Sequence, residues 1–213
     1  MSEPLQRPIP QLAELSLEQK VGQVIMGGFA DPSADSATVA AVRDGSLGNI
    51  ILFARNCPDA KRVAALTRAL QDAAPIPLLI AADQEGGLVT RLNVGATLTP
   101  GAMALGATGD TALAEQVAAM MADDLRGVGI NVCLAPVADV NANPANPVIG
   151  VRSFGEDAND VARFVVATLK GLQDQGVAAC AKHFPGHGDT GVDSHLALPR
   201  IDRSLDDLER VDL

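Results

Sequence analysis

The sequence predicts an α/β fold, a (β/α)8 TIM-type barrel of which the chain holds only the first five or so βα units. Short apolar runs alternate with longer segments of helical apolar spacing, which is typical of a parallel sheet covered by helices. Polar residues stand at or just after the ends of several runs, namely Asp83, Asp139 and the pair Lys182 and His183. Barrel enzymes place functional side chains at the C-terminal ends of different strands, whereas an open sheet gathers its site at one switch point. The spread of these residues favours the barrel.

The first half of the chain supplies three of the expected strands. Ser16 and Gln19 form a capping box that predicts a helix over 17–23, with a strand-like run over 24–26 directly after it. A helical stretch over 36–43 leads to a strand over 49–53. The next helix, over 59–71, carries one apolar stripe and is stopped by Pro75 and Pro77. A strand over 78–83 follows it.

Two further βα units follow in the second half. A helix over 111–126 ends at Gly127 and Gly129, and a strand over 131–136 comes next. We expect this helix to bury Leu113, Val117, Met120, Met121 and Leu125. A second helix, over 158–173, ends before Gly176 and leads to a strand over 177–183. We expect it to bury Val161, Val165, Leu169 and Leu172.

The number of strands is smaller than a complete barrel requires. Five strands are recognisable, whereas a barrel has eight and usually about 250 residues. The charged segment 205–210 has the pattern of a further helix that is just beginning. We therefore expect 1–213 to be the N-terminal portion of a single barrel domain that is truncated at its C-terminal side.

Composition excludes several classes of partner. The 213 residues carry 16 Lys and Arg against 26 Asp and Glu, a net charge of −10, which argues against binding to nucleic acid or to an anionic membrane. No apolar run approaches the roughly 20 residues of a membrane span, and no signal peptide is recognisable. Neither a G-x-G-x-x-G turn after the first strand nor a P-loop is present, so no nucleotide cofactor is expected. Cys57, Cys133 and Cys180 are expected to be reduced, buried thiols of a cytoplasmic protein.

The segment 182–195 is the richest in chemistry, because it contains all three histidines of the chain among several glycines. Asp193 and His195 could form a carboxylate–imidazole pair, which would suit a proton donor working near neutral pH. Imidazole and carboxylate also suit zinc, but no recognised metal spacing is present. A hydrated surface loop without function is the third interpretation. The residues that the metal interpretation would use are His183, His187, Asp189 and His195.

The segment from Lys182 to Thr190, followed by Asp193, Ser194 and His195, resembles glycoside hydrolase family 3. The similarity is greatest to its bacterial β-N-acetylglucosaminidase branch, whose enzymes act in peptidoglycan recycling. Other segments agree in the same order along the chain, so that the resemblance covers nearly all of it. These segments are 17–23, 48–53, 83–87 and 151–155.

The resemblance implies an exo-acting, retaining β-N-acetylhexosaminidase that removes terminal N-acetylglucosamine from peptidoglycan-derived muropeptides. It implies that His195 is the general acid/base, assisted by Asp193, in place of the second carboxyl group that most glycosidases use. It also implies no metal and no cofactor. The residues that it places around the sugar are Asp83, Arg91, Arg152, Lys182 and His183.

One element of the family pattern has no match. Retention requires a carboxylate nucleophile, which the family carries as an aspartate in a Ser-Asp-type motif after a later strand. We expect that position beyond Leu213, and we expect the 213 residues alone to be inactive. Two other functions stay open at this point, a non-catalytic sugar-binding fragment or remnant and a metal-dependent hydrolase. The sequence leaves the oligomeric state open.

Overall fold

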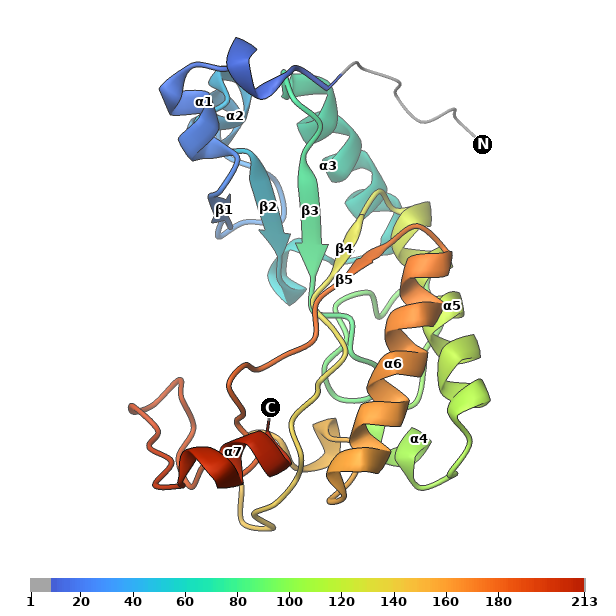
Figure 1. Ribbon diagram of the computed structural model, residues 1–213. Helices are drawn as coiled ribbons and strands as arrows, with labels where there is room; N and C mark the ends of the chain where they lie inside the picture. Colours follow the sequence, from blue (N-terminus) through green and yellow to red (C-terminus); the bar gives the residue numbers. More distant parts are fainter. Residues whose placement is uncertain (1–8, 213) are drawn as a thin grey trace. The chain divides into compact units, whose positions relative to one another are not determined.

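The computed structural model describes residues 9–212, which fall into two compact units (Figure 1). Unit 1 comprises the described residues up to Ala82 together with Arg91–Ala96 and Arg126–Val132. Unit 2 comprises Asp83–Thr90, Thr97–Leu125 and the described residues from Cys133 onward. Both units combine parallel strands with helices, so the α/β class is confirmed.

Unit 1 contains three parallel strands that are hydrogen-bonded in the order β1-β2-β3. Asn49 is opposite Leu79 in the register of β2 and β3, and Ile50 and Ile80 of these strands are completely buried. The elements of this unit, in chain order, are η1 (Leu12–Glu14), α1 (Leu17–Gly22), β1 (Met26–Gly27), α2 (Ser36–Asp44), β2 (Asn49–Leu52), η2 (Ala54–Asn56), α3 (Ala60–Ala73) and β3 (Leu79–Ala82). The expected capping box of α1 is present, with mutual hydrogen bonds between Ser16 and Gln19.

Side-chain amides complete the hydrogen bonding around β3. Asn131 accepts a hydrogen bond from the Ile80 backbone N–H at 2.7 Å and donates one to the Leu78 carbonyl at 3.0 Å. Gln71 makes the same pair of bonds with the backbone N–H and carbonyl of Leu78, both at 3.0 Å. Buried backbone N–H and C=O groups need hydrogen-bond partners. These two carboxamides supply the partners that a longer neighbouring strand would otherwise supply.

Unit 2 pairs the chain around β4 with the chain around β5. The Cys180 N–H donates to the carbonyls of Cys133 and Ala135, and the Lys182 N–H donates to the Pro136 carbonyl, each at 3.1 Å. The two segments therefore run side by side beyond the short strands themselves. The elements of this half are α4 (Ala102–Gly106), α5 (Thr111–Gly127), β4 (Val132–Cys133), η3 (Gly150–Arg152), α6 (Ala158–Asp174), β5 (Ala178–Ala179) and α7 (Leu205–Val211).

The helices of unit 2 agree with the sequence in position but differ in which residues they bury. Leu113 and Met120 of α5 are 37% and 48% exposed, contrary to expectation. Val117, Met121 and Leu125 are buried as expected, and they share the inward face of α5 with Ala114, Ala118 and Ala122, which are at most 1% exposed. Helix α6 comes closest to α5 at Gly171, beside Glu115 and Ala118.

Three further expectations differ from the structure. Leu169 of α6 is only partly buried, whereas Phe164 and Thr168 of the same helix are buried. Phe164 stacks on Phe154 with a centroid separation of 5.3 Å, which draws that side of α6 into the core. Cys180, which directly follows β5, is exposed, contrary to expectation, while Cys57 and Cys133 are buried as expected. Helix α4 had no expected counterpart.

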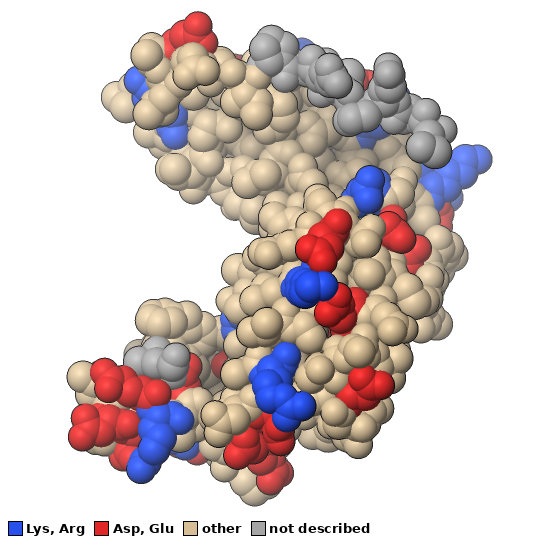
Figure 2. Space-filling view, turned by 45° about the vertical axis from the view of Figure 1, so that its right-hand side comes forward, with Lys and Arg blue, Asp and Glu red and all other residues tan. Residues whose placement is uncertain are grey.

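Charges on the surface are mixed in sign. On the face seen in Figure 2, Lys and Arg side chains alternate with Asp and Glu instead of gathering in one basic patch. Lys170 of α6, for example, pairs with Glu115 of α5 and with Asp174. Among residues 9–212, no helix is both long enough and apolar enough to cross a membrane.

The close approach of α6 to α5 is testable at Gly171. A Cβ added there would lie 2.3 Å from the Glu115 carbonyl oxygen, whereas one added at Gly127 would meet nothing within 4 Å. We expect Gly171→Ala to lower the free energy of unfolding by about 2 kcal/mol through overpacking, despite the better helix propensity of alanine. Gly127→Ala, the matched control, should be neutral or stabilising by up to about 1 kcal/mol. Denaturant unfolding measures both; equal effects would contradict the close contact.

Candidate active site

Charged side chains from four segments of unit 2 meet in one cluster. Glu85 and Asp83 lie on the segment that follows β3, Asp139 follows β4, and Arg152 ends η3. Lys182 comes from the chain that continues β5. Each of these positions lies at or beyond the C-terminal end of a strand or in the loop after it, which is where a barrel presents its functional residues.

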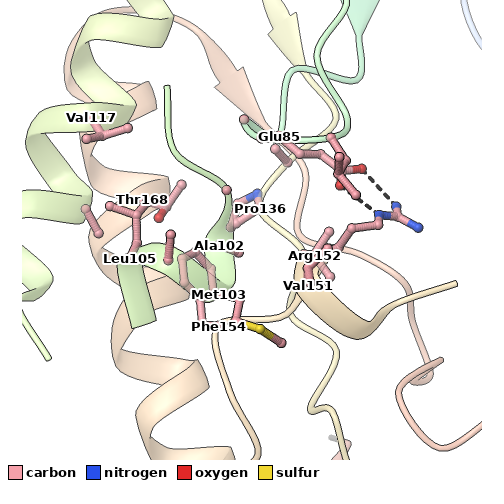
Figure 3. Close-up of a pocket in the computed structure, with 18 of the residues that line it drawn as sticks. Glu85, Ala102, Met103, Leu105, Val117, Pro136, Val151, Arg152, Phe154 and Thr168 are labelled. Carbon is pink, nitrogen blue, oxygen red and sulfur yellow. Dashed lines mark hydrogen bonds and ion pairs between the residues drawn. The ribbon is translucent and has the colours of Figure 1, made fainter. Parts of the chain in front are cut away.

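Lys182 and Arg152 are held between carboxylates. The Lys182 ammonium is 2.8 Å from Asp83 Oδ1 and 2.5 Å from Glu85 Oε1. Arg152 donates from Nε and Nη2 to the two oxygens of Glu85, both at 2.9 Å (Figure 3). The Glu85 side chain is only 6% exposed, so its charge depends on these two cations, as buried charges do.

Burial and neighbouring charge act on Arg152 in opposite directions. Burial disfavours its charge, but the hydrogen bonds and charge of Glu85, with the charges of Asp139 and Asp83, outweigh it and raise the pKa of Arg152. The guanidinium therefore stays charged and keeps its fork geometry toward Glu85.

Asp139 fixes the orientation of His183. Its carboxylate is completely buried, and Oδ2 lies 2.6 Å from His183 Nδ1 while Oδ1 accepts the backbone N–H of His187 at 2.6 Å. Since an ionised carboxylate only accepts, we assign the hydrogen to His183 Nδ1. His183 Nε2 then faces Arg152 Nη2 at 3.4 Å as an acceptor. The ring is one-third exposed, so one side of it remains open to a ligand.

Both ring nitrogens of His187 are engaged. Nδ1 lies 2.5 Å from Thr190 Oγ1, whose own hydrogen goes to the His187 carbonyl, and Nε2 lies 3.2 Å from Ser194 Oγ. Asn146 bonds both the His187 carbonyl and Thr190. His187 therefore holds the loop 187–194 together through its hydrogen bonds. Because both ring nitrogens already have partners, neither is free to bind a metal ion in this arrangement. No three His, Cys, Asp or Glu side chains within 9–212 are grouped as a metal ion would require.

Asp193 and His195 form the expected pair, but on an exposed loop. Asp193 Oδ1 is 2.7 Å from His195 Nδ1, and the His195 side chain is 81% exposed. Hydrogen bonds from the backbone N–H and the ring of His195, with the charges of His195 and His187, lower the pKa of Asp193. No hydrogen bond or ion pair described in residues 9–212 joins His195 to the charged cluster. Ser194, which lies between Asp193 and His195 in the sequence, connects this loop to His187 through its hydroxyl group.

The structure thus brings together Asp83, Arg152, Lys182 and His183 of the expected sugar-binding residues. Arg91 belongs to unit 1, and its role stays a prediction, as do the roles of His195 and Asp193. Glu85 is the cluster member that was not expected, whereas Asp139 was expected at a strand end but without an assigned role. Glu85 could have been found because it lies two residues after Asp83.

Cysteine chemistry has little support at this site. Burial raises the pKa of the Cys133 thiol to about 12. In unit 1, burial raises the pKa of the Cys57 thiol to about 11, against a smaller opposing effect of Arg91. Both thiols are therefore protonated at neutral pH and are not nucleophiles.

Comparison with known proteins gives one consistent family. The model of the glycosyl hydrolase family 3 N-terminal domain matches residues 16–213. A β-hexosaminidase A from Pseudoalteromonas piscicida is 47% identical over 177 residues, which cover 78% of this chain and 29% of that protein. A β-hexosaminidase from Thiobacillus denitrificans is 39% identical over 176 residues, 80% of this chain and 49% of that protein.

Solved structures agree with these relatives. A family 3 β-N-acetylglucosaminidase from a Paenibacillus species superposes with a TM-score of 0.90 at 49% identity, covering 93% of this chain and 38% of that one. NagZ from Neisseria gonorrhoeae, in complex with N-trifluoroacetyl-D-glucosamine, gives 0.82 at 37% identity, over 88% of this chain and 57% of that one. The chain thus has the fold of part of these barrel domains and spans less than two-thirds of each of these relatives.

The buried position of Asp139 predicts a large structural cost for its removal. Asp139→Ala would leave His183 Nδ1–H and the His187 N–H without their acceptor, so we expect the free energy of unfolding to fall by about 3 kcal/mol. Asp202 is 72% exposed and pairs with Arg200, so Asp202→Ala should change it by less than about 0.5 kcal/mol. Denaturant titration compares the two; a similar small loss in both would show that Asp139 is not a structural centre of the cluster.

Proposed function

The chain belongs to glycosyl hydrolase family 3, and from this membership we propose that it is part of an exo-acting β-N-acetylhexosaminidase. The observation that carries the proposal is the ion-paired cluster of Asp83, Lys182, Glu85 and Arg152 with His183 beside it. A sugar presents hydroxyl groups that both donate and accept hydrogen bonds. Carboxylates, an ammonium and an imidazole that are already held in place can bind such groups at low entropic cost.

Within this proposal Asp83, Lys182 and His183 bind hydroxyls of the terminal sugar. Asp83 and Lys182 are 16% and 14% exposed, so each reaches solvent only over a small area. Their mutual ion pair restricts their rotamers before any ligand arrives. Glu85 and Asp139 then act as positioning residues, because Glu85 holds Lys182 and Arg152 while Asp139 holds His183.

The proposed general acid/base is His195, with Asp193 orienting its ring. The contact between Asp193 and His195 Nδ1 leaves Nε2 as the nitrogen that exchanges a proton with the glycosidic oxygen. Retention further needs a carboxylate nucleophile. The family motif that supplies it has no match in these residues, so the proposed activity is that of a chain that also carries this motif.

The finer parts of the proposal follow from the family resemblance. We propose N-acetylglucosamine-bearing muropeptides derived from peptidoglycan as substrates and the cytoplasm as the location. No metal or cofactor takes part in the proposed reaction. The closely similar β-N-acetylglucosaminidase and β-hexosaminidases support the N-acetylated sugar over an unsubstituted glucoside.

The activity can be tested on the longest natural reading frame that contains these residues. We expect it to release 4-nitrophenol from the N-acetyl-β-D-glucosaminide at least about 100-fold faster than from the β-D-glucoside, and to be insensitive to EDTA. Binding of N-acetylglucosamine without release of 4-nitrophenol would indicate a sugar-binding protein instead. Loss of activity in EDTA would favour a metal-dependent hydrolase.

The role of His195 predicts a dependence on the leaving group. His195→Ala should reduce kcat/KM by about 100-fold or more for aryl glycosides whose phenols are weak acids, since these need protonation as they depart. For a dinitrophenyl glycoside the loss should be only a few-fold. Arg200→Ala, on the same stretch of chain and 82% exposed, serves as the control and should leave the series unchanged. Equal losses across the series would remove His195 from the acid role.

A further inference from the structure

Arg203 joins two carboxylates that lie on different segments of unit 2. Its Nε is 2.9 Å from Asp189 Oδ2, and its Nη1 is 3.0 Å from Asp212 Oδ2. The Arg203 side chain is 20% exposed and the Asp212 side chain only 1%. An exposed ion pair stabilises little, but a mostly buried guanidinium that uses two separate nitrogens holds both carboxylates in one geometry. Arg203 therefore fixes the position of Asp189 relative to Asp212.

The ion pair between Asp189 and Arg203 closes the base of a loop. The segment between these two residues, 190–202, carries His195 and the Asp193 that orients it. His195 is 81% exposed, and most other residues of the segment are exposed as well. Exposed side chains supply little packing, so the position of this loop depends on the few contacts that hold its ends.

The N-terminal end of the loop is held by the backbone just before it. The His187 N–H donates to Asp139 Oδ1 at 2.6 Å. Gly188 packs so closely against the Val140 carbonyl that a Cβ would not fit between them. Because Asp139 belongs to the charged cluster, this end of the loop is attached to the proposed sugar site independently of Arg203.

The C-terminal end of the loop is held by Arg203. Helix α7 begins directly after this residue, and Val211 in the last turn of the helix packs against the hydrophobic core of unit 2. Asp212 is the C-cap residue of α7. Arg203 thus links the C-terminal end of the loop to the end of α7 through Asp212, and to the N-terminal end of the loop through Asp189.

We propose that Arg203 is a positioning residue for proton transfer by His195, because its ion pair at the base restricts the positions of the loop 190–202. The inference rests on the function proposed above. The hydrogen bond between Ser194 and His187, 3.2 Å long, restrains the middle of the loop but leaves its C-terminal end to Arg203. Without the ion pair, His195 is in place for a smaller fraction of the time. Protonation of the leaving group then becomes slower, while sugar binding by the cluster is unchanged.

Asp189 is the residue to change in a test. Removal of Arg203 would leave the buried carboxylate of Asp212 without its partner and would destabilise the protein strongly. Asp189→Ala breaks only the ion pair at the base of the loop. Since the Asp189 side chain is about one-third exposed, the melting temperature should fall by less than about 4 °C. Asp202→Ala is the matched control, because Asp202 pairs with the exposed Arg200 on the same stretch of chain.

Kinetics of the longest natural reading frame test the positioning role. Asp189→Ala should lower kcat/KM about tenfold for aryl N-acetyl-β-glucosaminides whose phenols are weak acids, but less than about twofold for the dinitrophenyl glycoside. The inhibition constant of N-acetylglucosamine should change by less than about twofold. Asp189→Asn keeps an oxygen that accepts from Arg203 Nε and should lose only about threefold. Asp202→Ala should match the wild type, whereas a merely structural role would lower every rate alike.

Hydrogen exchange tests the loop without reference to activity. The Leu196 and Ala197 N–H groups donate to the Asp193 carbonyl at 2.9 and 3.1 Å, so exchange in peptides that cover 191–202 reports how well the loop is ordered. We expect exchange to be about three- to tenfold faster in Asp189→Ala than in the wild type or in the control variant.

The proposal is overturned if exchange in the loop is unchanged in Asp189→Ala, if the loss of rate is equal for all leaving groups, or if sugar binding weakens together with the rate. A wild type that does not hydrolyse the N-acetylglucosaminides would instead refute the proposed function. The exchange measurement alone would then decide whether Arg203 closes the loop.

Discussion

Charge pairing in a nearly dry environment is the interaction on which unit 2 depends. Glu85 contacts both cations of the cluster, and each of these comes from a different part of the chain. Taking such charges out of water is costly unless every one has a partner of opposite sign. The segments that carry Glu85, Arg152 and Lys182 can therefore be in place only together, and the loops at this end of the strands share one electrostatic centre.

The sequence predicts the members of this centre that lie at strand ends, but it does not predict the carboxylate that pairs with them. Buried strands appear in the sequence as apolar runs, so the end of each run marks the end of a strand. Asp83, Lys182 and His183 were predicted because they stand at such ends. Glu85 was missed as a member, since its importance comes from two cations that are 67 and 97 residues further along the chain. Long-range pairing of this kind leaves no periodic signal.

Helix packing shows the same limit. Apolar periodicity located α5 and α6 to within two residues, yet it assigned Leu113 and Met120 to the core. At one point the packing depends on the backbone, because Gly171 lets α6 approach the Glu115 carbonyl of α5 very closely. A similar close approach occurs where Gly86 and Gly87 pack directly against the backbone of Pro100 and Gly101. Apolar periodicity does not reveal backbone contacts of this kind.

The amide of Asn131 has a consequence for the lifetime of the protein. Its nitrogen donates to the Leu78 carbonyl while its oxygen accepts from Ile80. Spontaneous deamidation would turn that nitrogen into a carboxylate oxygen of almost the same shape, and two acceptors would then face each other. Asn56 and Asn146 use both ends of their amides in the same way. Chemical ageing at these three side chains, with no change in the encoded sequence, would loosen the packing that holds the strands and the histidine loop.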